Sequence, residues 1–254
     1  MSNQQTIEKL VESAAKDGRI TADENNEILR QSEGLTEVNL ALAFARQAVR
    51  HLQPKLGLVA NWDLSVPTSA ENIYMTTGDE LRARAAENAA DKCVYPKVKG
   101  NPAHQQIINS GGIRNLDHIK IIAGLAETYG CGNCAEQAAR AFLYLLSLGV
   151  VALDYMRLEG ADHAFVVLGR RPTAPVAEND SWLKWGDSAV VCDVWAGGLI
   201  KYDPRAPVKE SHFPESYTAY PAKLLGQNMK AMFPTFQYPV LEYRYSLGKP
   251  NPEI

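Results

Sequence analysis

The chain is poor in the features that mark secreted, membrane-bound or nucleic-acid-binding proteins. It has four cysteines in 254 residues, too few for a disulfide framework, so we expect a reducing compartment such as the cytoplasm of the producing cell. No apolar run approaches about 18 residues, and no basic segment leads into an apolar core at the N-terminus, so neither a membrane-spanning helix nor a cleaved signal peptide is expected. The net charge of -3 and the pI near 6.0 argue against nucleic acid and membrane surfaces as partners.

The composition, 46% hydrophobic and 22% charged, supports a sizeable core. Helical patterns come first and strand patterns second, which is typical of an α+β fold. We expect residues 1–66 to form a helical N-terminal appendage that ends in a linker at 53–68, and residues 67–254 to form a catalytic α+β domain. Thr21 and Glu24 have the spacing of a capping box. The expected helices cover 4–52, 69–92 and 102–128, the last broken by Gly111-Gly112, and the expected strands cover 150–158, 163–169, 189–195 and 238–247.

The most informative segment surrounds Cys134, where a glycine-rich turn leads into an amphipathic helix. Asn133 and Glu136 stand at N-cap and N3 spacing, so Cys134 is predicted to be the first helical residue and Gly149 to end the helix. A helix N-terminus favours the thiolate form of a cysteine. The Cys134 amide, positioned by Asn133, is a natural donor to an oxyanion.

Two further residues follow in the order that a nucleophilic cysteine site requires. His163 precedes an apolar strand, and Asp193 follows Val190-Val191-Cys192. If these two strands pair, Asp193 can hold one imidazole nitrogen while the other faces Cys134, so that His163 takes the thiol proton. Trp195 would pack there and shield the His–Asp hydrogen bond from water.

Other readings of these residues remain open. Cys134 could be a packing cysteine, His163 a satisfied core histidine and Asp193 a turn residue replaced by Asp187 or Asp203. Cys131 could be the nucleophile instead, or could form a Cys-x-x-Cys redox pair with Cys134, although the segment before it reads as a helix and not as the strand of a thioredoxin-like fold. A zinc site would need a second cysteine pair, and Cys93 and Cys192 are isolated. Three other histidines are interpreted as surface or cap residues: His104, His118 and His212.

Three blocks resemble a known superfamily. Gly-Cys-Gly-Asn-Cys-Ala-Glu-Gln-Ala, Ala-Asp-His-Ala-Phe-Val-Val-Leu-Gly and Val-Val-Cys-Asp-Val-Trp-Ala, within residues 125–200, resemble the Cys-His-Asp core of papain-like and transglutaminase-like enzymes, especially versions from bacterial effectors and toxins. The resemblance implies a nucleophile helix packed on an antiparallel sheet, with Cys134 as nucleophile, His163 as base and Asp193 as orienter. Ala135 stands where papain-type enzymes have an aromatic residue, and the glutamine that usually supplies the second oxyanion donor is absent.

The expected function is therefore acyl-enzyme chemistry on amide bonds of a protein substrate, by a protease, a glutamine deamidase or a transglutaminase. The resemblance implies a role as a bacterial effector or toxin, secreted without a cleaved signal peptide and acting on a host protein. No metal or organic cofactor is expected. The alternatives are a small-molecule acyltransferase with the same triad, a non-catalytic interaction module on this fold, and a dithiol redox protein.

Overall fold

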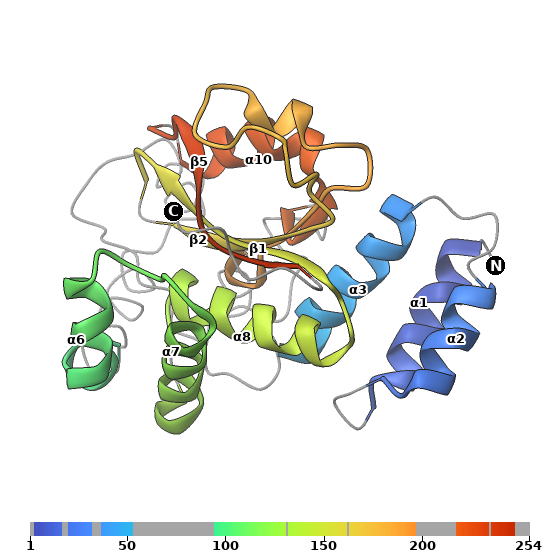
Figure 1. The fold of residues 1–254 in the computed structure, drawn as a ribbon, viewed down its shortest axis with the longest axis horizontal. Coiled ribbons are helices and arrows are strands. Elements are labelled where there is room, and N and C mark those ends of the chain that lie inside the picture. The colour runs from blue at the N-terminus through green and yellow to red at the C-terminus, as the bar shows by residue number, and fades with distance from the viewer. Residues whose placement is uncertain are drawn as a thin grey trace, which may run out of the picture.

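The protein folds as an α+β structure in which helices cover a five-stranded antiparallel sheet (Figure 1). The computed structural model describes residues 3–16, 20–31, 37–52, 94–130, 132–161, 163–196, 217–233 and 235–246. The expected linker at 53–68, the boundary at residue 66 and the expected helix at 69–92 lie outside these residues. Among the described residues, no helix is long and apolar enough to cross a membrane.

The sheet has the strand order β4-β3-β2-β1-β5, and every neighbouring pair is antiparallel. The strands predicted at 150–158, 163–169 and 238–247 begin and end within about two residues of the expected positions. The strand predicted at 189–195 is shorter than expected, because the chain turns into a helical segment after Asp193. One strand, β4, was not predicted. The strands are β1 (Ala152–Glu159), β2 (Ala164–Leu168), β3 (Val190–Cys192), β4 (Ala219–Pro221) and β5 (Tyr238–Ser246).

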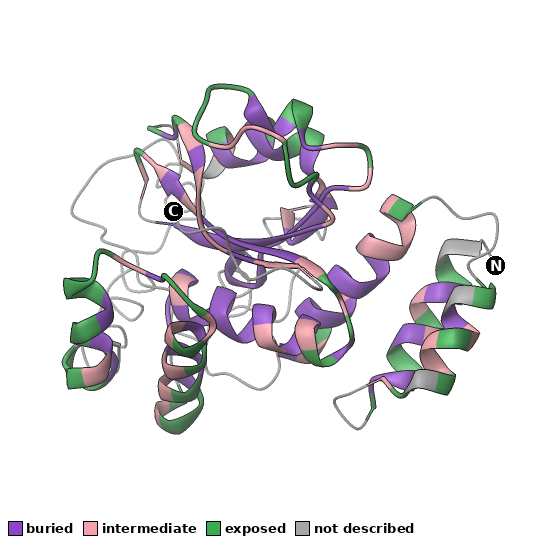
Figure 2. Cartoon of the chain, viewed as in Figure 1, coloured by how far each residue is buried: buried purple, intermediate pink, exposed green. Residues whose placement is uncertain are grey.

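The central strand β2 is buried along its whole length because both faces of the sheet are covered. Alternate side chains enter two cores, as the period of two in a strand requires. Val166 belongs to the core shared with the long helices, whereas Phe165 and Val167 belong to a core with Trp182 and Trp185. The short helices η2 (Ser181–Lys184), η4 (Ala222–Leu224) and α10 (Leu225–Met232) border this second core. Figure 2 shows the middle of the sheet as mostly buried, whereas the edge strand β5 is largely intermediate.

The N-terminal region is helical, as predicted, with α1 (Asn3–Ala14), α2 (Ala22–Gln31) and α3 (Glu37–Leu52). The predicted capping box before α2 is confirmed, since the Thr21 amide donates to the Glu24 carboxylate at 2.9 Å. Helix α3 packs against α8, β3 and β4 and shares their core, whereas α1 packs against α3, and α2 packs against α1 (Figure 1). Helix α3, the last helix of the expected N-terminal appendage, therefore packs on the sheet and belongs to the same core.

The helices that frame the site follow in sequence: η1 (Val94–Lys99), α6 (Pro102–Asn109), α7 (Leu116–Tyr129) and α8 (Cys134–Ser147). The break between α6 and α7 falls at Gly111 and Gly112, as predicted, and both have the positive φ angles that glycine tolerates. Helix α8 lies between α7 and the sheet, where it contacts β1 and β2. The predicted packing of the Cys134 helix on an antiparallel sheet is therefore present.

Candidate active site

Helix α8 begins at Cys134, as predicted, because the residues before it form a capping box. The Glu136 carboxylate accepts a hydrogen bond from the Asn133 amide at 2.7 Å, which fixes the turn that carries Cys134. Gly132 is required there by close contact, since a Cβ atom at this position would lie 2.5 Å from the Glu136 Cβ. At the other end, Gly149 has a φ of 80° just beyond the helix, as expected for its end. The sequence therefore places Cys134 at N1 with little freedom.

His163 and Asp193 are brought together by the pairing of β2 and β3, in which Val166 lies opposite Cys192. The Nε2 atom of His163 lies 2.7 Å from the Oδ2 atom of Asp193, and the two side chains are 0% and 1% exposed. The other carboxylate oxygen accepts from the Ala196 amide at 3.1 Å, and the Asp193 amide donates to the Thr218 carbonyl at 2.7 Å. The aspartate is thus fixed at both ends, and it is not an ordinary turn residue.

This contact determines which imidazole nitrogen can act as a base. The carboxylate accepts a hydrogen bond only if Nε2 carries the proton, so Nδ1 of the neutral ring keeps its lone pair. This buried Nδ1 has no hydrogen-bond partner among the described residues. An imidazole in this state is poised to accept a proton from a group beside it.

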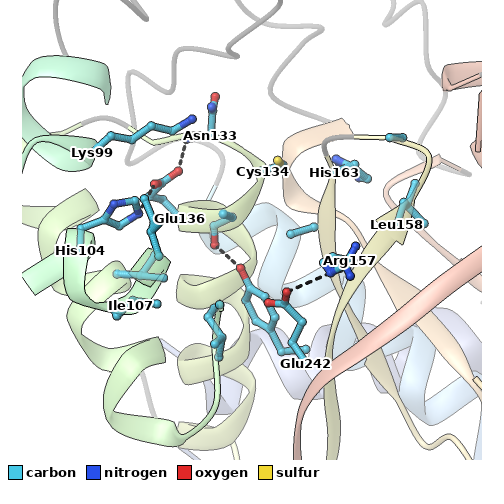
Figure 3. A pocket seen from close by; sticks show the side chains of 18 residues that line it. Lys99, His104, Ile107, Asn133, Cys134, Glu136, Arg157, Leu158, His163 and Glu242 are labelled. Atoms are coloured by element: carbon cyan, nitrogen blue, oxygen red, sulfur yellow. Dashed lines mark hydrogen bonds and ion pairs between the residues drawn. The ribbon is translucent and has the colours of Figure 1, made fainter. Parts of the chain in front are cut away.

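Cys134 and His163 line one pocket of about 310 Å³, enclosed by α6, the loop before α7, the start of α8, and strands β1, β2 and β5 (Figure 3). Cys134 is only 7% exposed. Cys134 forms a small apolar cluster with Trp195, and Phe233 packs against this cluster. Cys134 is therefore largely buried although a glycine-rich turn precedes it. The pocket is the opening beside its sulfur atom.

An aromatic enclosure surrounds the His163 ring. Phe233 stacks on it with ring centroids 4.7 Å apart, and Trp195 lies at 4.9 Å. Trp195 is 4% exposed and lies beside the His163 ring, which is the position expected of a residue that shields the His–Asp hydrogen bond from water. The enclosure lowers the local dielectric and so strengthens that hydrogen bond. Phe233, which follows α10, was not predicted to belong to the site.

One expectation is wrong: His104 is not a surface or cap residue. It is 6% exposed on the buried face of α6, and its Nε2 atom lies 3.6 Å from the Oε1 atom of Glu136. Burial, the dominant influence, lowers the pKa of His104, while the Glu136 charge raises it and the Lys99 charge lowers it. His118 does lie at a cap, since its amide donates to Asn115 at 2.9 Å. His212 lies outside the described residues.

The rival residues are placed only in part. Asp187 is exposed, whereas Asp203, Cys93 and Cys131 lie outside the described residues. Cys192 is fully buried, and burial raises the pKa of its thiol. The segment before Cys131 is the helix α7, as predicted. No cluster of three or more metal-ligating side chains occurs among the residues that the structure describes.

Comparisons with protein-family models, with curated proteins and with solved structures found no match. The interpretation of the site therefore rests on its residues and geometry.

Proposed function

We propose that the protein is a thiol enzyme in which Cys134 attacks the carbonyl of an amide bond in a protein substrate. The observation that carries the proposal is the buried 2.7 Å hydrogen bond between His163 and Asp193, which leaves Nδ1 of the imidazole as an acceptor in the pocket that Cys134 also lines. A merely structural histidine would be expected to have both ring nitrogens engaged when its side chain is fully buried. The resemblance of the three sequence blocks to papain-like and transglutaminase-like enzymes supports the same roles.

The reaction follows from these roles. Nδ1 of His163 accepts the thiol proton, and the thiolate forms a bond to the substrate carbonyl carbon. The developing oxyanion lies near the first-turn amides of α8, which include that of Cys134 and which the hydrogen-bond ladder of the helix does not use. Collapse of the intermediate breaks the carbon–nitrogen bond, and the imidazolium returns its proton to the leaving amine. Asp193 stabilises the imidazolium through its contact with Nε2.

The acyl-enzyme must then be resolved by water or by an amine. Water gives proteolysis or glutamine deamidation, and an amine gives transglutamination. The resemblance to bacterial effector and toxin enzymes favours a host protein as the substrate. These outcomes separate by mass when the protein is incubated with a candidate host proteome: cross-linking loses about 17 Da, deamidation adds about 1 Da, and cleavage creates new termini.

The proposed nucleophile can be tested without a known substrate. Iodoacetamide labelling, followed by mass spectrometry of the cysteine-containing peptides, should modify Cys134 faster than Cys192 and faster than the same cysteine in the unfolded chain. His163→Ala should slow labelling of Cys134 by removing its base. His118→Ala, which changes a histidine at the N-terminus of α7, is the matched control and should label like the wild type. Labelling of folded Cys134 no faster than in the unfolded chain would contradict the proposal.

A further inference from the structure

A second imidazole–carboxylate pair lies in the same pocket, formed by His104 of α6 and Glu136 of α8. The two residues are 6% and 1% exposed, and Figure 3 shows them on the other side of the α8 N-terminus from His163. Glu136 and Cys134 are two positions apart on the helix, so their side chains point in different directions. A substrate whose carbonyl reaches Cys134 would therefore present a neighbouring group, and not the reacting carbonyl, to this pair.

The polar atoms of this pair that lack partners are acceptors. Oε2 of Glu136 accepts from the Asn133 amide, whereas Oε1 of Glu136 and Nδ1 of His104 have no hydrogen-bond partner among the described residues. Burial favours the neutral imidazole. Its proton belongs on Nε2, which faces the carboxylate, so Nδ1 carries the lone pair. A buried acceptor without a partner is unfavourable, and a donor from a ligand would remove that cost.

The charges around the pocket favour an uncharged donor. Two cations, Lys99 and Arg157, and two carboxylates, Glu136 and Glu242, line it. Arg157 pairs with Glu242 at 3.2 Å. Lys99 is close enough to lower the pKa of His104, so its charge opposes that of Glu136 at the same position. The ammonium group of a ligand would be repelled by the charge of Lys99 while it binds the acceptors. A neutral NH₂ group would not be repelled.

The rest of the lining suits a short aliphatic stem. Ile107, Ile113 and Leu158 provide apolar wall, and the volume of about 310 Å³ lies at the lower end of the range for small-molecule pockets. The space fits one side chain with an apolar stem and a polar end. A methionine would fill the stem region but leave both acceptors without donors.

We propose, on the basis of the proposed function, that this pocket is a specificity subsite for an uncharged carboxamide side chain next to the reacting bond. The NH₂ group of a glutamine or asparagine donates a hydrogen bond to Oε1 of Glu136, beside the uncharged ring of His104. His104 and Glu136 thus select the substrate, while Cys134, His163 and Asp193 perform the reaction.

The test compares peptide chloromethyl ketones that differ only in the side chain next to the electrophile: glutamine, glutamate, methionine or lysine. Each alkylates Cys134 by forming a sulfur–carbon bond and releasing chloride, while His163 takes the thiol proton. The glutamine probe should label Cys134 faster than the methionine probe by roughly 2- to 13-fold for each hydrogen bond gained, the factor that about 0.5–1.5 kcal/mol corresponds to. The glutamine probe should also label Cys134 faster than the lysine and glutamate probes do.

Glu136→Gln is the decisive variant, because glutamine at N3 can also complete a capping box. Its amide oxygen would take over the contact with the Asn133 amide, so its NH₂ group would face the pocket and replace an acceptor with a donor. The preference for glutamine over methionine should then fall to about one, and the glutamate probe should gain. Glu37→Gln, the same change on an exposed position of α3, should alter no ratio.

The outcomes separate this inference from the function on which it rests. If no probe labels folded Cys134 faster than the unfolded chain, the thiol enzyme itself is refuted. If Cys134 is labelled rapidly but the methionine, glutamate or lysine probe is the fastest, the carboxamide subsite is refuted and the thiol enzyme stands. An unchanged glutamine preference in a folded Glu136→Gln protein would also overturn the subsite.

Discussion

Gly132→Ala should displace the turn that carries Cys134. The added Cβ atom would lie 2.5 Å from the Cβ of Glu136 and 3.3 Å from its Cγ. A Cβ atom is attached to the backbone and cannot rotate away, so ordinary contact at 3.4 Å requires the two segments to separate by about 0.9 Å (from 2.5 to 3.4 Å). Overpacking of this kind costs about 1–3 kcal/mol of folding free energy.

The same displacement should lower the reactivity of Cys134. A misplacement of about 1 Å at a reacting group can cost roughly 100-fold in rate, so alkylation of Cys134 should slow by up to that factor while the protein stays folded. The measurements are urea unfolding and iodoacetamide labelling resolved by peptide.

Gly124→Ala is the matched control. Gly124 lies in the middle of α7, and nothing lies within 4 Å of an added Cβ atom there. Alanine should therefore stabilise the helix by about 0.5–1 kcal/mol and leave labelling unchanged. Equal stability and equal labelling for the two variants would refute the tight packing of Gly132 against Glu136.

Three further predictions concern stability. Asp154 lies in a buried cluster with Arg170 at 2.5 Å and Arg244 at 2.9 Å, so Asp154→Asn should cost about 3–5 kcal/mol in urea unfolding by leaving two buried cations without their counter-charge; a loss below 1 kcal/mol would show that the cluster is dispensable. Burial lowers the pKa of His104, so below the ordinary histidine pKa of about 6.5 the native state binds fewer protons than the unfolded state, and the stability that His104 contributes is present above that pH and lost as the pH falls. The difference in unfolding free energy between the wild type and His104→Phe should therefore shrink on acidification. A difference that grows would show that the pKa of His104 is raised in the folded state and not lowered. Asn133→Ala removes the N-cap of α8 and should cost about 0.5–2 kcal/mol with altered Cys134 labelling; an unchanged melting temperature and labelling rate would contradict the capping role.

The parts of the site that could be predicted are those with a local signal. The residues Asn133 and Glu136 mark the start of α8 by their spacing alone, and the glycines at 111, 112 and 149 mark ends of helices. The meeting of His163 and Asp193 needed one non-local assumption, that β2 pairs with β3, and strands that follow one another along the chain commonly pair even across a longer connection such as the one that carries η2.

The parts that were missed depend on contacts between distant segments. His104 carries no clear local sign of burial, because α6 has only eight residues, and only the packing of α6 near the start of α8 brings His104 to Glu136. Phe233 reaches His163 across 70 positions of sequence. Strand β4 has three residues and ends in Pro221, too few to show a period of two. Glu136 was recognised as a capping residue, but its second contact cannot be read from the sequence.

The most direct test of the central claim is a double-mutant cycle on the labelling rate of Cys134. Asp193→Asn keeps the shape of the side chain and its acceptor for the Ala196 amide but changes the group that faces Nε2 of His163. If Asp193 acts on Cys134 through His163, Asp193→Asn should slow labelling in the wild type and have no further effect in the His163→Ala background. Equal effects of Asp193→Asn in the two backgrounds would show that the three residues do not act as one unit.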